Sequence, residues 1–161
     1  MVLDVLDLDA LRRAAAGAEA VTFDHEHVPN RFLDDLIAQG VNVQPQPAAL
    51  IHAQDKLVMR KKLREMGAPV PAFAAIESAD DIAGFFDAVG GQVCLKARRG
   101  GYDGKGVWFP ATVDEARELV EKLLDKEIPL MAEKKVALVR ELSNAVEGFQ
   151  PAGDADRALL R

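Results

Sequence analysis

The sequence predicts a mixed α/β and α+β protein, in which part of a parallel α/β domain precedes a small α+β sandwich. Alternating helix and strand patterns occupy the first 47 residues. A β-α-β-β-α-β order, punctuated by glycine and proline, occupies residues 72–143. Hydrophobic residues make up 49% of the 161-residue chain and charged residues 29%, a composition that indicates a globular core rather than disorder.

Residues 1–47 read as helix, strand, helix and strand. Acidic residues open a helix over 7–17, and Asn30 is expected to cap a second helix that ends at a glycine. Short apolar strands are expected at 20–23 and 41–43. The alternation predicts a partial Rossmann-like sheet, and only part of one, because two short strands cannot form a stable open sheet.

Residues 48–71 are predicted to connect two lobes. One long helix is expected over 48–66, because apolar residues recur along one side and a glycine follows. The basic run 60–62 on its polar side is interpreted as a solvated face. The proline-rich stretch 68–71 then forms a stiff linker that marks the boundary between the lobes.

The second lobe, residues 72–143, has the most regular pattern. Its expected strands are 73–76, 93–97, 107–109 and 128–133, with a further β-like stretch at 136–142. Two helices begin at the capping-box residues Ser78 and Thr112. The order predicts an antiparallel sheet with helices on one face. Residues 144–161 show no period and are interpreted as a disordered or weakly packed tail.

Charge and the missing motifs exclude several classes of function. The net charge of −6 argues against a nucleic-acid-binding surface. No run of 18 apolar residues and no basic, apolar leader are found, so we expect a cytoplasmic protein without a membrane partner. The single cysteine, Cys94, lies in an apolar strand and is expected to be a buried thiol. GxSxG, HExxH and CxxC patterns are missing from the sequence.

The stretch 93–109 is the leading candidate site, because it combines glycine with positive charge. Its glycines are Gly100, Gly101, Gly104 and Gly106, and its cations are Lys96, Arg98, Arg99 and Lys105. Glycine lets the backbone approach a ligand closely, and exposed N–H groups beside cations suit a polyphosphate. The alternative is a solvated hairpin turn, and the loop matches neither GxxxxGK[ST] nor GxGxxG.

Three other groups of residues are weaker candidates. Lys96 in an apolar strand needs a partner if it is buried, and either a phosphate or Glu133 would serve; the alternative is a solvated lysine. Glu133 and Glu141 could accept hydrogen bonds from a ligand or be ordinary surface acids. Residues 24–27 (Asp-His-Glu-His) follow a strand and could form a metal site or a substrate loop, although His-x-His without a third ligand is weak evidence for a metal.

Several segments together carry a family likeness. They are VTFDHEHVP at 21–29, QDK at 54–56, Lys96 with RRGGYDGKG at 98–106, and the run 133–141. Over about residues 7–143 the chain resembles the ATP-grasp superfamily, and within it the N5-carboxyaminoimidazole ribonucleotide synthetases. It differs in having Val107 where the family usually has glutamine and Asp24 where glutamate is common. A glycine-rich N-terminal segment and everything after about residue 143 are lacking, and residues 144–161 do not resemble the family.

The resemblance implies a division of the chain and a set of ATP-binding residues. Residues 72–143 would be the ATP-grasp lid subdomain, 1–47 the remnant of the first domain and 48–71 the connection. Lys56 and Lys96 would contact the ATP phosphates. The loop that folds over the phosphates would comprise Gly101, Tyr102, Asp103, Gly104, Lys105, Gly106 and Val107. The hinge that lines the adenine pocket would comprise Glu133, Lys134, Lys135 and Val136, and Glu141 would bind the ribose hydroxyls.

The reaction implied by the resemblance is a carboxylation that consumes ATP. ATP and bicarbonate give carboxyphosphate, 5-aminoimidazole ribonucleotide is carboxylated on nitrogen, ADP and phosphate leave, and Mg²⁺ neutralises the phosphates. The acidic Mg²⁺ ligands of the family lie in the missing region, so no metal ligand is assigned and the chain alone is expected to be incomplete for catalysis. A homodimer is the family's usual assembly. The alternatives are a non-catalytic nucleotide-binding fragment, or another ATP-grasp ligase or formyltransferase; the loop 25–27 favours the carboxylating enzyme.

Overall fold

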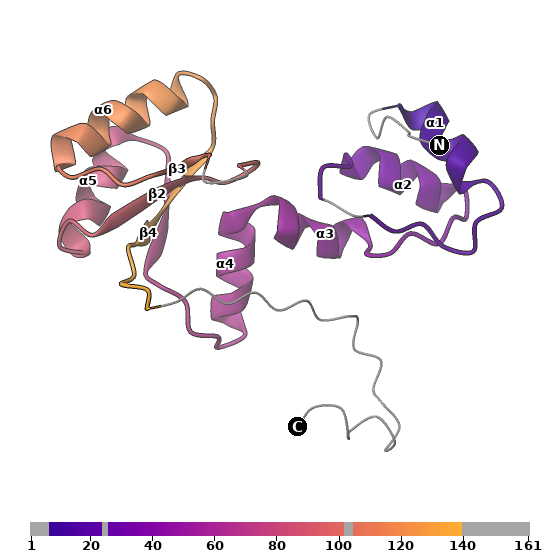
Figure 1. Ribbon diagram of the computed structural model, residues 1–161, viewed down its shortest axis with the longest axis horizontal. Coiled ribbons are helices and arrows are strands. Elements are labelled where there is room, and N and C mark those ends of the chain that lie inside the picture. The colour runs from indigo at the N-terminus through magenta and orange to yellow at the C-terminus, as the bar shows by residue number, and fades with distance from the viewer. Residues whose placement is uncertain (1–6, 24–25, 102–104, 140–161) are drawn as a thin grey trace, which may run out of the picture.

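The computed structural model describes residues 7–23, 26–101 and 105–139, which form two groups of elements joined by a pair of helices (Figure 1). The N-terminal group contains α1 (Leu8–Ala15) and α2 (Asn30–Ala38). The connecting helices are α3 (Pro47–Gln54) and α4 (Lys56–Glu65). The second group contains β1 (Phe73–Ile76), α5 (Ala79–Ala88), β2 (Val93–Ala97), β3 (Val107–Trp108), α6 (Val113–Leu124) and β4 (Leu130–Lys134).

The N-terminal group has less strand structure than predicted. The expected strands at 20–23 and 41–43 are reduced to one parallel bridge between Val21 and Val43, because such short segments find no third strand among the described residues. The parallel direction agrees with the α/β pattern. A small core that includes Leu33 and Leu36 holds the group together.

The start of α2 also differs from the prediction. Pro29 occupies the N-cap position, and no side chain caps the helix there. Asn30, which was expected to be the cap, is the first helical residue, and its Oδ1 accepts a hydrogen bond of 3.0 Å from Nε2 of Gln54. Its side chain therefore connects α2 to α3 instead of satisfying the end of its own helix.

The second group confirms the predicted antiparallel sheet and β-α-β-β-α-β order. The strand order is β1-β4-β2-β3, and every neighbouring pair is antiparallel. Ser78 and Thr112 cap α5 and α6 as predicted, accepting hydrogen bonds from the N–H groups of Asp81 and Glu115. Both helices lie on the same side of the sheet in Figure 1, and their apolar faces share one core with it.

The central strands present different chemistry on their two faces. Leu95 of β2 and Ala132 of β4 point into the core shared with α5 and α6. Because successive side chains alternate between faces, Lys96 and Glu133 belong to the opposite face. Arg60 of α4 forms an ion pair with Glu133, so α4 lies against that second face. The polar face of the sheet therefore meets the connecting helices.

The single helix predicted over 48–66 is wrong, because the chain breaks at Asp55. This residue has extended backbone angles, φ −129° and ψ 109°, and separates α3 from α4. Its side chain accepts hydrogen bonds from the N–H groups of Leu57 and Val58, which makes it the N-cap of α4. The C-terminal end of α3 and the N-terminal end of α4 therefore meet at Asp55, next to the sheet.

The β-like stretch predicted at 136–142 is wrong over the part that the structure describes. Residues 135–139 contain no strand, and 140–142 lie outside the described residues, as does the tail predicted at 144–161. The N–H group of Lys135 donates to the carbonyl of Gln92 at 2.8 Å, one residue beyond the end of β4. No helix in the described ranges is long and apolar enough to cross a membrane.

Candidate functional site

A buried carboxylate forms the centre of the polar face of the sheet. Glu133 is 4% exposed and accepts from two cations, Nζ of Lys96 at 2.6 Å and the guanidinium of Arg60. Burial alone would raise the pKa of this carboxyl, but the hydrogen bonds from Lys96 and Arg60 outweigh burial, and the pKa lies below its ordinary value. The sequence-based expectation that Glu133 could be the partner of Lys96 is confirmed.

The interpretation of residues 60–62 as a solvated face is wrong for Arg60. Its side chain is 22% exposed and paired with Glu133, whereas Lys61 is exposed. Two positive charges, Arg60 and Lys96, therefore share one negative charge. The local excess of positive charge makes this face suitable for an anionic ligand.

A second lysine adds to this excess. Nζ of Lys56, at the start of α4, donates to the carbonyl oxygen of Gly100 at 2.7 Å. Burial and the positive charge of Lys96 lower the pKa of Lys56, and the attraction of Glu26, Asp55 and Glu133 does not restore it. The charge of an anionic ligand near the two lysines would stabilise both ammonium groups and so offset burial and repulsion.

The base of the glycine loop has a backbone that requires glycine. Gly101 has φ +89°, and a Cβ built on it would lie 2.5 Å from the carbonyl oxygen of Lys105. The N–H group of Ala97 donates to the carbonyl of Gly106 at 2.8 Å, which closes the loop at its base. The two ends of the loop thus approach each other closely beside Lys96. Tyr102, Asp103 and Gly104 lie outside the described residues.

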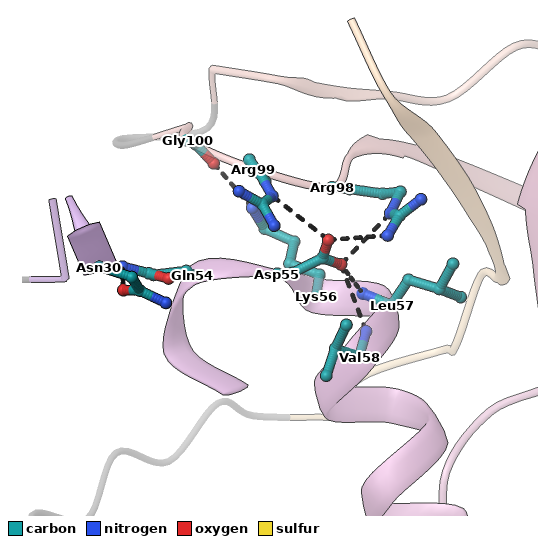
Figure 2. Close-up of polar contacts among 9 residues, drawn as sticks. All are labelled: Asn30, Gln54, Asp55, Lys56, Leu57, Val58, Arg98, Arg99 and Gly100. Atoms are coloured by element: carbon teal, nitrogen blue, oxygen red, sulfur yellow. Dashed lines mark hydrogen bonds and ion pairs between the residues drawn. The ribbon is translucent and has the colours of Figure 1, made fainter. Parts of the chain in front are cut away.

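Asp55 ties this loop to the break between α3 and α4 (Figure 2). The carboxylate is 1% exposed and accepts from Nη2 of Arg98 at 2.8 Å and from Nε of Arg99 at 3.4 Å. Burial alone would raise its pKa, but the hydrogen bonds from Arg98 and from the N–H group of Val58 keep the pKa below its ordinary value. Asp55 is therefore a charged carboxylate that joins the loop to α4.

Gln54 connects the same break to the loop that precedes α2. Its Nε2 lies 3.0 Å from the carbonyl oxygen of Glu26, 3.3 Å from that of Val28 and 3.0 Å from Oδ1 of Asn30. A pocket of about 410 Å³ opens here. Its lining comes from both loops: Glu26, His27, Val28, Pro29, Asn30 and Arg31 on one side, Arg99 and Gly100 on the other, with Ile51 and Gln54 of α3. A pocket of this size can hold a small molecule.

The remaining predicted residues lie in or beyond the end of β4. Lys134 is the last residue of β4, and its N–H group donates to the carbonyl of Ala72 at 2.8 Å. Val136 is 51% exposed. Glu141 lies outside the described residues. Cys94 is buried as predicted, and burial raises the pKa of its thiol.

Sequence reasoning assigned no role to Asp55 beyond its place in a family motif, and it assigned none to Arg60. The signal for Asp55 was present, because an aspartate directly before a new apolar helical pattern is a typical N-cap. The signal for Arg60 was missing, because its partner Glu133 is 73 residues away in the chain. Within 7–23, 26–101 and 105–139, no group of three or more His, Cys, Asp or Glu side chains could hold a metal ion.

The class of protein follows from this fold, its glycine loop and a family match. The sequence profile of the ATP-grasp domain matches residues 61–148, more than half of the chain. The chain belongs to the ATP-grasp family. The profile runs past residue 143, where the likeness was expected to end, so that prediction was wrong.

Within this family the chain is a homologue of the N5-carboxyaminoimidazole ribonucleotide synthases. It is 62% identical over 151 residues to the enzyme of Corynebacterium ammoniagenes, a match that takes in 94% of this chain and 36% of that protein. Because at most about 10 residues fall outside that match, at least the first part of the segment 144–161, which was expected to be unlike the family, lies within it. The chain spans about a third of the length of the curated relatives it matches.

Two solved structures give the same relationship. The carboxyaminoimidazole ribonucleotide synthase of Aspergillus clavatus complexed with ATP is 27% identical, with a TM-score of 0.71 over 83% of this chain and 35% of that chain. The synthase of the same organism in complex with ADP and 5-aminoimidazole ribonucleotide is 26% identical, with a TM-score of 0.66 over 80% of this chain and 32% of that one.

Proposed function

We propose that this chain supplies the ATP-binding part of a carbon–nitrogen ligase that carboxylates 5-aminoimidazole ribonucleotide with bicarbonate and ATP. The products are N5-carboxyaminoimidazole ribonucleotide, ADP and phosphate. The observation that carries the proposal is the placement of Lys56 and Lys96 beside the base of the glycine loop, where Nζ of Lys56 donates to the carbonyl oxygen of Gly100 and Lys96 lies near the end of β2. A related synthase has been solved with ATP.

We infer that the lid subdomain spans 72–143, that 1–47 belongs to a Rossmann-like domain and that 48–71 connects them. In this assignment Lys56 and Lys96 hold the phosphates. The loop from Gly101 to Val107 covers the phosphates, and Glu133 to Val136 line the adenine pocket. Glu141 takes the ribose hydroxyls.

The chemistry assigned to this chain is electrostatic. Phosphoryl transfer depends mainly on positioning and on stabilisation of charge, which two lysines and the N–H groups of a glycine loop supply. No Mg²⁺ ligand is assigned to the described residues, among which no group of three or more His, Cys, Asp or Glu side chains could hold a metal ion. The steps proposed for this chain are therefore to bind ATP, orient its phosphates and exclude water from a labile acyl phosphate.

The pocket of about 410 Å³ is the proposed site for the ribonucleotide. It is lined by the loop 26–31 and by Gly100, so a ligand in it would lie next to the phosphate-binding loop. This placement is what transfer of an activated carboxyl group to an amine requires. A homologue has been solved with ADP and 5-aminoimidazole ribonucleotide together. Bicarbonate and a homodimer enter the proposal from the family resemblance alone.

Titration calorimetry of the purified chain with ATP in the presence of Mg²⁺ tests the nucleotide site. Lys56→Met removes one of the two cations, and we expect ATP affinity to fall by about 10- to 100-fold, since a hydrogen bond to a charged group contributes about 1.5–3 kcal/mol. Lys122→Met is the matched control, because Lys122 is an exposed lysine on α6, across the sheet from Lys96. No binding by the wild-type chain, or equal affinities for the two variants, would contradict the proposal.

A further inference from the structure

Three consecutive residues at the break between α3 and α4 contact two loops that are far apart in the sequence (Figure 2). Nε2 of Gln54 donates to the loop before α2, with the carbonyl oxygen of Glu26 at 3.0 Å. The N–H group of Lys56 donates to the carbonyl of Arg98 at 2.9 Å, and its Nζ to that of Gly100 at 2.7 Å. The break therefore joins the two walls of the pocket at one point.

Asp55 lies between these contacts and has two functions in the fold. One is the cap of α4, with the N–H groups of Leu57 and Val58 at 3.0 and 3.2 Å. The other is the ion pair with Arg98, in which Nη2 and Nε lie 2.8 and 3.2 Å from the carboxylate oxygens. A cap alone does not need a charge, because serine and asparagine cap about as well as aspartate. The carboxylate is required by the arginines.

Arg98 links Asp55 to the candidate phosphate site. It directly follows the last residue of β2, and Lys96 is two residues earlier. Its side chain is held by Asp55, its carbonyl by Lys56, and its N–H group donates to the carbonyl of Pro129 at 2.8 Å. Contacts with Asp55, Lys56 and Pro129 thus fix the point where the chain leaves β2 and enters the glycine loop.

We propose that Gln54, Asp55 and Lys56 form a clamp that sets the base of the glycine loop against the pocket, and that Asp55 is a positioning residue for the nucleotide phosphates. The clamp brings Lys56 to the end of β2, two residues from Lys96, and holds Gly100 at the rim of the pocket. The role for the phosphates rests on the proposed function. The mechanical role, holding residues 98–100 on α4, does not depend on it.

Asp55→Asn separates the two functions of the residue. Asparagine keeps the size and the oxygen that caps α4 but removes the charge that holds the arginines. Asp7→Asn is the matched control, because Asp7 caps α1 in the same way, with the N–H groups of Asp9 and Ala10 at 3.0 and 3.1 Å. Helix α1 lies in the N-terminal group, away from the glycine loop (Figure 1).

Backbone hydrogen exchange, read by mass spectrometry, tests the mechanical role. In Asp55→Asn we expect exchange in the peptide covering 96–101 to be faster by about tenfold, while Asp7→Asn leaves it unchanged. If this peptide exchanges in Asp55→Asn at the same rate as in the wild-type chain, the clamp is wrong. If circular dichroism shows that Asp55→Asn does not fold, Arg98→Gln replaces it, since this variant keeps the cap of α4 and removes the shorter of the two ion pairs of Asp55, the one with Arg98.

Calorimetry with ATP and with adenosine tests the positioning role. Asp55→Asn should weaken ATP by at least about tenfold and leave adenosine within about twofold, because only ATP carries the phosphates. An equal loss for both ligands, or a loss for neither, would overturn the positioning role. Absence of ATP binding by the wild-type chain would refute the proposed function and this role together, and the exchange experiment would still decide the clamp.

Discussion

At the scale of residues, the site depends on a few partly or fully buried charges, among which positive groups outnumber the carboxylate they share. Glu133 neutralises only part of the positive charge of Arg60 and Lys96, and Lys56 brings another cation to the same region. Removing one partner from a buried ion pair is more harmful than its small net contribution suggests, because the other charge is left without compensation. An anionic ligand would supply the compensation that the protein leaves out.

The lowered pKa of Lys56 gives a prediction about pH. Binding of phosphates requires the charged ammonium, which is lost as the pH rises through a pKa that lies below the ordinary value of 10.5. ATP affinity should therefore begin to fall at an alkaline pH below 10.5, a range in which the triphosphate is already fully ionised. Lys56→Arg should reduce this alkaline loss, because arginine stays protonated above pH 12. Calorimetry across this range measures it, with adenosine as the reference, and an identical alkaline loss in the arginine variant would contradict the assignment.

At the scale of elements, the glycine loop connects β2 and β3, which form a short antiparallel hairpin. The two ends of the loop lie close together. The predicted strands on either side were confirmed, as was the antiparallel sheet, because short runs of β-prone apolar residues bounded by glycine or proline are local signals. The helix break at Asp55 was missed, although its N-cap signal is local too. The apolar periodicity over 48–66 continued across the break and concealed it.

Two neighbouring glycines of the loop should respond differently to alanine. Gly100 has φ +67° with no atom within 4 Å of an added Cβ, so Gly100→Ala should cost only about 1–2 kcal/mol in loop strain. In Gly101→Ala the new Cβ would meet the carbonyl oxygen of Lys105 at 2.5 Å, so the base of the loop must move.

We therefore expect Gly101→Ala to weaken ATP binding by at least about tenfold more than Gly100→Ala. Calorimetry with both variants, after circular dichroism has shown that both are folded, measures the difference. Equal affinities in the two variants would show that the close approach of Gly101 to Lys105 has no part in nucleotide binding.

At the scale of the whole molecule, two small cores are joined by a kinked pair of helices (Figure 1). The sequence predicted the order and class of these parts, because each core is made of segments that are close in the sequence. It could not predict how the parts meet, because the contacts at the joint span 24 to 73 residues. Arg60 with Glu133, and Asp55 with Arg98, are pairs of charged residues that only the folded chain brings together.

The central claim is that the nucleotide phosphates bind between the α4 start and the glycine loop, on the polar face of the sheet. The most direct test is a titration of ¹⁵N-labelled chain with ATP, followed by the shifts of the backbone amide signals. We expect the largest shifts at Lys56, at residues 96–101 and 105–107, and at 133–136, while α5 and α6 stay unchanged. Shifts that cluster on α5 and α6, or no shifts at millimolar ATP, would contradict the account.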